Sequence, residues 1–293
     1  MSERIVIEVG GEEQLSPQQR EDAIRSVQAM AMPAIESRNR AFESEAATEE
    51  LSKAINGPLI ALYEQDGKAR RVAEEERPLL SASPDWHVDW LDTPTQVESP
   101  REGRAFFTPP FHFPWAWHRV DGCPPNFVRH NNSAGVLAME GAAGPLAPGS
   151  CGRFVEVHAG FGIGIRPERD GLLVANSDRR FMKFIYEVAA YGVGSFAVTE
   201  GGTECSLMSE GLWKAGESRK KFRKRVSVNE RERFESNLFG DGVMRHVIPV
   251  RAGQDYQFNI GAWLYVDNAS GVGQSGAIAG VRLEVPIMEL FGP

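Results

Sequence analysis

The sequence predicts a mainly β protein, with an antiparallel β-sandwich or jelly-roll body and an acidic α-helical N-terminal arm. Two observations predict the body: apolar and polar residues alternate in several runs after residue 153, and turn-forming glycines separate these runs. A third observation predicts the arm. Apolar residues recur at helical spacing within residues 1–76, which also carry an excess of acidic side chains.

Two runs define the sheet faces most clearly. In "FVEVHAGFGIGI" (154–165) the alternate apolar residues share one face, and Glu156, His158 and three glycines share the other. In "YQFNIGAWLYV" (256–266), Trp263 and Tyr265 fall on the less apolar face. Further strands are expected at 180–188, 195–199, 226–228, 243–250 and 281–290. Turns are expected at Gly201-Gly202, Gly240-Asp241-Gly242 and Ala252-Gly253.

The phrase "VIPVRAGQDYQFNIGAWLYV" resembles the closing strands of Ig-like and carbohydrate-binding β-sandwich modules, in which an Ala-Gly turn delivers a Tyr into the next strand. The resemblance covers roughly the last 50 residues and identifies no specific family. It implies a sandwich fold and carries over no catalytic residue.

The arm is expected to contain three short helices. Ser16 suits an N-cap before Pro17, and the first helix should end at Pro33. A second is expected over 37–56, and a third from Pro58. Residues 1–100 carry 20 acidic and 10 basic side chains, whereas the rest carries 20 and 22. This asymmetry suggests different roles for arm and body and gives no support to nucleic-acid binding.

Residues 77–152 are rich in proline and are expected to form an irregular connection to the sandwich at 153–293. Within it, "PPFHFPWAWHRVDGCPPNF" (109–127) is dense in aromatic residues. Its alternation places Phe111, Phe113, Trp115 and Trp117 on one side, which favours a plug that covers the sandwich. Docking of a sugar, peptide or subunit is the alternative. The candidate ligand- or partner-binding residues are His112, Trp115, Trp117, His118, Trp263 and Tyr265.

The bare strand face of Gly160, Gly162 and Gly164 predicts close contact. Either a bulky neighbour such as Trp263 or Tyr265 covers it, or a second chain or the N-terminal helices lie on it. The small-residue segment "GVGQSGAIAG" (271–280) is typical of a turn between strands, and also of a membrane-inserting hairpin.

The basic segment "RKKFRKR" is expected to be a loop that contacts an anion or the acidic arm, in the same chain or a neighbouring copy. A solvated loop is the alternative. The residues concerned are Arg219, Lys220, Lys221, Arg223, Lys224 and Arg225.

Three cysteines, Cys123, Cys151 and Cys205, lack metal-binding or redox spacing, and we expect buried free thiols rather than a Cys123–Cys151 bridge. No secretory signal is recognisable at the N-terminus, so synthesis in the cytoplasm is expected, with the final location open. No catalytic motif is found, and His112 and His118 do not have zinc-ligand spacing.

The sequence therefore predicts a non-catalytic structural or binding subunit without a cofactor or metal. It would self-associate or dock a partner through the helical arm, the glycine-rich face and the aromatic segment. We expect a homo-oligomer or larger assembly, with carbohydrate or protein as candidate partners. The alternatives are a pore-forming, toxin-like protein that acts on membranes, and a metal-dependent jelly-roll enzyme that uses His112, His118 or His158.

Overall fold

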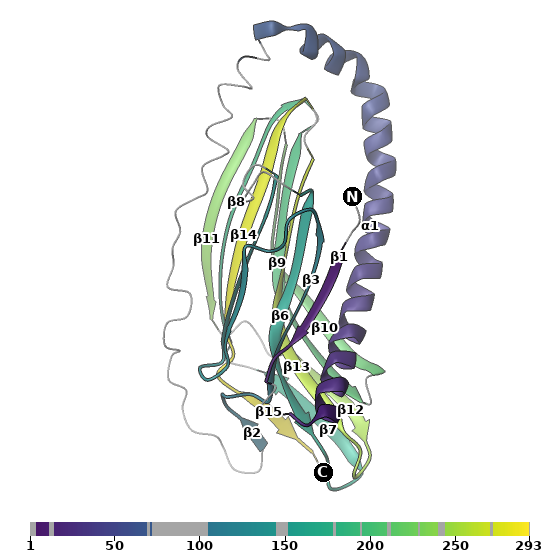
Figure 1. Cartoon of the computed structure of the whole chain (residues 1–293), viewed down its shortest axis with the longest axis vertical. Helices are drawn as coiled ribbons and strands as arrows, with labels where there is room; N and C mark the ends of the chain where they lie inside the picture. Colours follow the sequence, from purple (N-terminus) through teal and green to yellow (C-terminus); the bar gives the residue numbers. More distant parts are fainter. Residues whose placement is uncertain are drawn as a thin grey trace.

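A computed structural model of the chain shows a mainly β protein with one long helix near the N-terminus (Figure 1). It describes residues 4–11, 15–68, 71, 105–144, 152–177, 180–193, 195–209, 212–227, 229–239, 244–269 and 272–292. All the strand pairings within this part are antiparallel, as the alternating sequence predicts.

The strands form three sheets. Sheet A contains, in spatial order, β1 (Arg4–Val9), β3 (Phe113–Asp121), β6 (Phe154–Ile165), β13 (Tyr256–Ala269), β9 (Phe196–Ser209) and β10 (Leu212–Ser227). Sheet C contains β11 (Glu230–Phe239), β8 (Phe181–Val193), β14 (Val272–Glu284), β5 (Val136–Ala143) and β4 (Phe127–Asn131). Sheet B contains β12 (Met244–Val250), β7 (Gly171–Ser177), β15 (Met288–Phe291) and β2 (Ala105–Phe107).

The main core contains residues of all three sheets, and the faces of β6 and β13 are those predicted from the alternation. Val157 and Phe161 of β6 and Phe258 and Leu264 of β13 are fully buried in this core. The opposite face of the same strands carries Glu156, His158, the glycines, Trp263 and Tyr265 and is directed towards α1. Two-residue periodicity thus divides sheet A into a core face and a second, covered face.

The arm is one helix, α1 (Pro17–Gln65), so the expectation of three helices was wrong. Its start was predicted correctly: the Gln19 N–H donates to Ser16 Oγ at 3.3 Å, and the Ser16 N–H donates to Gln19 Oε1 at 2.9 Å. Pro33 and Pro58 both lie inside the helix. Buried residues on either side of Pro33, including Val27, Met30 and Ile35, pack on sheet A, and this packing offsets the cost of a proline in a helix.

The region expected to be irregular contains four strands, β2 to β5, between residues 105 and 143. Pro114 is tolerated because β1 ends at Val9, opposite Trp115, and at the end of this pairing the proline only accepts, from the Gly10 N–H at 2.9 Å. The remaining prolines of 77–104 and 145–151 lie outside the described residues.

Two predicted loops are strands instead. Gly201-Gly202 lies within β9, where a side chain at Gly201 would meet the Phe222 ring and one at Gly202 the backbone of Arg219. The basic segment 219–225 lies in β10, with Phe222 and Val226 turned into the core. The Ala252-Gly253 turn is confirmed, with Gly253 at φ +74°. The predicted turn at 240–242 lies outside the described residues.

Candidate functional site

The covered face of sheet A is built from large aromatic side chains seated on glycines. Phe113, Trp115 and Trp117 of β3 are each about 1% exposed and pack between the sheet and α1. A side chain at Gly160 would collide with the indole of Trp115 and the carbonyl oxygen of Ile260. The predicted contact on the glycine face is therefore made within the chain, by these aromatic side chains beneath the helix.

Gly160→Ala is expected to lower the free energy of unfolding by about 1–3 kcal/mol, because the added methyl group would displace Trp115 or the backbone of β13. Gly164→Ala is the matched control on the same strand, because its methyl group would meet only His112 Nδ1, at 3.8 Å. Urea denaturation of both variants measures the difference. Equal stabilities would contradict the close packing at Gly160.

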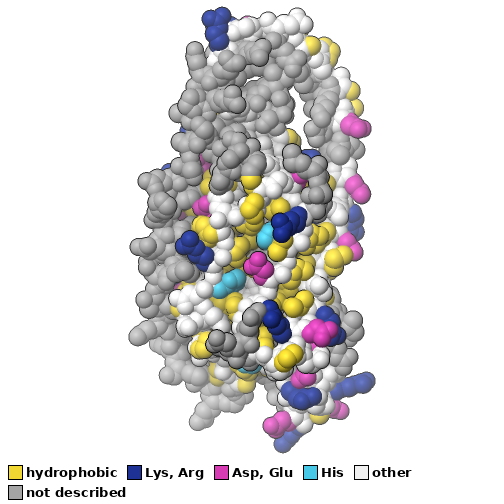
Figure 2. Space-filling view, viewed as in Figure 1, with side chains coloured by type: hydrophobic (Ala, Val, Ile, Leu, Met, Phe, Trp, Pro, Cys, Tyr) yellow, Lys and Arg dark blue, Asp and Glu magenta, His cyan; other side chains and the backbone are white. Residues whose placement is uncertain are grey.

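A cavity of about 530 Å³ lies between the first half of α1 and sheet A. Apolar side chains of the helix, Met30, Pro33 and Ala34, line one wall. Charged side chains line the opposite wall and come from β6 and from the consecutive strands β9 and β10. On the face shown in Figure 2, acidic and basic side chains of the described residues are interspersed rather than separated by sign.

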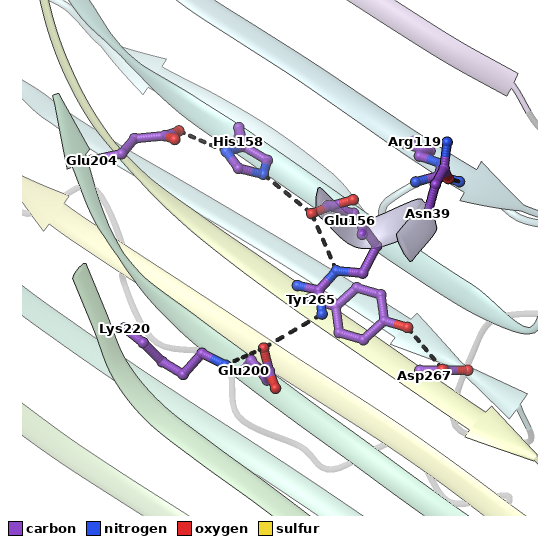
Figure 3. A network of polar contacts seen from close by, with 10 residues as sticks. Asn39, Arg119, Glu156, His158, Glu200, Glu204, Lys220, Tyr265 and Asp267 are labelled. Carbon is purple, nitrogen blue, oxygen red and sulfur yellow. Dashed lines mark hydrogen bonds and ion pairs between the residues drawn. The ribbon is translucent and has the colours of Figure 1, made fainter. Parts of the chain in front are cut away.

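His158 is the centre of the charged wall (Figure 3). Its Nδ1 lies 2.7 Å from Glu204 Oε1, and its Nε2 lies 3.6 Å from Glu156 Oε1. The imidazole ring stacks on Trp117 at a centroid distance of 3.8 Å and lies 6.1 Å from the ring of Trp263. Burial lowers the pKa of His158, but the neighbouring carboxylates of Glu204 and Glu156 outweigh it and raise the pKa to about 9.

The helix contributes a cation to the same network. Arg38 Nε lies 3.7 Å from Glu156 Oε1, and its NH1 lies 3.5 Å from Glu200 Oε2. The guanidinium also lies over the ring of Tyr265, 3.9 Å from the centroid. Burial would raise the pKa of Glu156, yet His158, Arg38 and Arg119 together hold it below its ordinary value. The network therefore links α1 to the sheet through ion pairs.

The residues predicted from the aromatic stretch occupy different environments. Trp115 and Trp117 are buried under α1, and His112 and His118 are half-buried. His112 Nδ1 accepts a hydrogen bond from the Gly164 N–H at 2.9 Å, away from His158. These aromatic side chains are buried, as the plug interpretation predicts, but β3 lies between β1 and β6 rather than at an edge, and Phe113, Trp115 and Trp117 pack under α1 rather than in the main core.

The other two predicted residues, Trp263 and Tyr265, belong to the region of the cavity. Trp263 lines it, and Tyr265 donates from its hydroxyl group to Asp267 Oδ2 at 2.7 Å. Both are buried, at 6% and 3% exposure. Their position on the same face as His158 follows from the strand alternation.

The basic strand β10 pairs with glutamates of the body. Lys220 Nζ and Arg223 Nε lie 2.7 Å and 3.0 Å from the carboxylate of Glu200. Its remaining basic residues have these positions: Arg219 pairs with Glu217, Lys224 pairs with Glu232, Arg225 lies over the ring of Phe196, and Lys221 lies on the same strand. The helical residue that joins this charge network is basic, Arg38, rather than acidic.

Sequence reasoning missed Arg38, Glu200, Glu204 and Glu217. Glu200 and Glu204 flank a glycine pair that resembles a turn, and this concealed a strand that continues to Ser209. The signal that could have identified them is the four-residue spacing of the two glutamates, which places both on one face of a strand.

The remaining expectations concern the cysteines, the segment 271–280, metal binding and membrane insertion. Cys123 is disulfide-bonded, which contradicts the expected free thiol, and Cys205 is free and buried. Burial raises the pKa of Cys205 to about 12. The segment 271–280 lies mostly in β14, a central strand of sheet C. In the described part of the chain, no cluster of three or more His, Cys, Asp or Glu side chains is arranged to hold a metal ion, and no helix is long and apolar enough to span a membrane.

Comparisons with known proteins give no family. No protein-family description matches the chain, and no curated protein matches it. Among solved structures, the chain aligns with Arthrobacter globiformis T6 isomalto-dextranase complexed with panose at 11% sequence identity and a TM-score of 0.17. The alignment covers 64% of this chain and 24% of that one, so it spans about a quarter of the enzyme chain. A similarity at this level supports no conclusion about fold or function.

Proposed function

We propose that this protein is a non-catalytic structural or binding subunit that docks a second copy of itself through the distal part of α1. The observation that carries the proposal is an exposed apolar stripe. Leu51, Ile55 and Leu62 are 62%, 67% and 64% exposed, and their spacing places them on one face of the helix. Such a stripe on a long helix is typical of a helix-pairing surface.

The first half of α1 is already occupied by its own sheet. Ser26 Oγ accepts a hydrogen bond from Asn259 Nδ2 at 2.8 Å, and Phe42 packs on Phe154 at a ring-centroid distance of 5.1 Å. A helix of 49 residues is about 73 Å long, so its second half runs well past these contacts, as Figure 1 shows. Figure 1 also shows that α1 bends near its distal end, so the anchored half would present the distal half as a curved arm.

Charge favours a second copy as the occupant. The stripe is flanked by the exposed Glu43 and Glu50 on its N-terminal side and by the exposed Lys68 on its C-terminal side. In an antiparallel pair centred near Gly57, Leu51 of one copy would face Leu62 of the other, and Lys68 would face the acidic turn around Glu43 and Glu50. Both copies use the same patch in a two-fold interface, so the patch must be complementary to itself, as this one is.

The charged cavity favours binding over catalysis. A general acid or base works best with a pKa near the working pH, whereas His158 is held as a cation with a pKa of about 9. Its neighbours Glu156 and Glu204 are engaged in ion pairs with it. This arrangement supports a non-catalytic role.

Light scattering behind a sizing column tests the proposal. The wild-type chain is expected at twice its mass of 32.3 kDa, and the Leu51→Glu/Ile55→Glu variant at the mass of one chain. Met32→Glu is the matched control, because Met32 is 53% exposed on the anchored half of the same helix. It should keep the dimer.

Charge-reversal variants distinguish specific pairing of the two helices from non-specific association. Glu43→Lys and Lys68→Glu should each weaken the dimer, and their combination should restore it. High salt should weaken the wild-type dimer, because these charges are exposed. A wild-type monomer, or a dimer unchanged by Leu51→Glu/Ile55→Glu, would overturn the proposal.

A further inference from the structure

The cavity beneath α1 contains buried polar atoms that the protein leaves without a hydrogen-bond partner. Among the described residues, three of those lining it have such an atom: Glu156 Oε2, His158 Nε2 and Trp263 Nε1. These residues are 2%, 4% and 6% exposed. Because an unsatisfied buried polar group costs about 1–3 kcal/mol, three together around one cavity call for an explanation.

These three atoms offer complementary hydrogen-bonding roles. The carboxylate oxygen of Glu156 accepts, and the indole N–H of Trp263 donates. Because the pKa of His158 is about 9, its Nε2 also carries a proton at neutral pH and donates. A ligand that satisfies all three must both donate and accept, and each hydroxyl group does so.

The net charge of the residues that line the cavity indicates the charge of the ligand. Its acidic residues are Glu156, Glu200, Glu204 and Glu217, and its basic residues are Arg38, His158, Lys220 and Arg223. Four negative and four positive groups cancel, so the site has no net attraction for an anion or a cation. The neutral balance favours a neutral ligand with many hydroxyl groups.

The helical wall and the volume fit such a ligand. Met30, Pro33 and Ala34 present apolar surface, which suits the C–H faces of a sugar ring. The volume of about 530 Å³ falls inside the range of about 300–1,000 Å³ that is typical of small-molecule sites.

We propose that the cavity between α1 and sheet A is a binding site for a neutral mono- or disaccharide. Sugar hydroxyl groups donate to Glu156 Oε2 and accept from His158 Nε2 and from Trp263 Nε1, while the ring contacts the apolar wall of the helix. The site joins α1 to the sheet, so a bound sugar holds the anchored half of the helix in place. This proposal does not depend on the pairing of the distal half.

Titration calorimetry of the full chain with glucose, galactose, mannose, N-acetylglucosamine, maltose and lactose tests the proposal, with phosphate and choline as charged probes. At least one of these sugars should bind saturably at one site per chain. Glu156→Gln and Trp263→Phe should each weaken that binding about 10-fold or more, since each removes one hydrogen bond to the sugar.

The matched controls lie outside the cavity. Trp115→Phe removes an indole N–H that is likewise buried and unpartnered, and Glu230→Gln neutralises an exposed carboxylate of β11. Both should leave sugar affinity unchanged, with circular dichroism confirming that each variant folds. Three results would overturn the proposal: no binding of these sugars at about 10 mM, binding of a charged probe alone, or equal affinity in Glu156→Gln, Trp263→Phe and the controls.

Discussion

Replacing Trp115 by alanine is expected to lower the free energy of unfolding by about 3–5 kcal/mol. The indole is 1% exposed and fills the space between two glycines of sheet A, Gly160 and Gly261, and the buried face of α1. Because the residues beneath the indole on both strands are glycines, they supply no side chain that could fill the void. Urea denaturation, followed by far-ultraviolet circular dichroism, measures the loss.

The same substitution should loosen α1 from the sheet. Val27 of the helix is fully buried in the hydrophobic cluster that contains Trp115. In a double-mutant cycle, Trp115→Ala and Val27→Ala should therefore be non-additive by about 0.5–3 kcal/mol. His118→Ala is the control on the same strand, because His118 is half-buried outside this cluster, and its cost should add to that of Val27→Ala. A loss below about 1 kcal/mol for Trp115→Ala, or strict additivity with Val27→Ala, would contradict the packing described above.

The aromatic stretch illustrates what the sequence could predict. Alternation correctly placed Phe113, Trp115 and Trp117 on one side of a strand, because successive side chains of any strand point to opposite faces. It was wrong for Phe111, which lies before β3 and packs in the main core. Alternation does not specify what covers that side. The cover is α1, which lies about 90 residues earlier in the chain, and no local pattern encodes such a contact.

Glycine and proline gave the principal errors, each for a physical reason. Gly201 and Gly202 resemble a turn, but they serve the close approach of Phe222 and of the β10 backbone. Pro33 resembles a helix end, but tertiary packing on both sides of it maintains the helix. Glycine allows the backbone to be approached closely, and proline restricts it. Both properties are used in turns and helix ends, but also inside tightly packed strands and helices.

Only part of the charged site could be predicted from the sequence. Glu156 and His158 lie on one strand, so their spacing revealed them as a pair. Glu204 and Arg38 reach His158 and Glu156 from β9 and α1, and only the folded arrangement brings them together. The sequence can therefore reveal only those members of such a site that lie close together in one correctly predicted element, as Glu156 and His158 do in β6.

The stability of the protein is expected to fall by about 3 kcal/mol as pH rises from 6.5 to about 9.5, through the titration of His158 alone. Folding raises the pKa of His158 from its ordinary 6.5 to about 9, so the folded protein holds this proton more tightly than the unfolded chain. The stabilisation is complete below pH 6.5 and is lost as pH rises through 9, and a difference of about 2.5 in pKa corresponds to about 3 kcal/mol. Cys205 adds to this loss above about pH 8.5, because the thiol of the unfolded chain ionises near its ordinary pKa, whereas burial raises the pKa of the folded thiol to about 12. The ordinary pKa of Tyr265 is 10.0, and burial raises it further, so Tyr265 titrates above this window in both states.

Glu204→Gln is the variant that isolates the effect. It keeps the shape of the side chain at 2.7 Å from His158 Nδ1 but removes the charge that most raises the pKa. At pH 6 the variant should be about 3–5 kcal/mol less stable than the wild type, because a buried cation loses its partner. Between pH 6.5 and 9.5 its stability should change much less than that of the wild type.

Two measurements decide the outcome. Urea denaturation at intervals from pH 6 to 10 gives the stability profile, and the histidine ring resonances in an NMR titration give the pKa of His158 directly. Glu232→Gln is the control: this glutamate pairs with Lys224 on the other side of the protein core, so the wild-type profile should persist. A pKa below 7 for His158, or parallel profiles for the wild type and Glu204→Gln, would show that the imidazole is neutral. In that case α1 would be held on sheet A by packing, by Ser26 and by the ion pairs of Arg38, without the buried imidazolium.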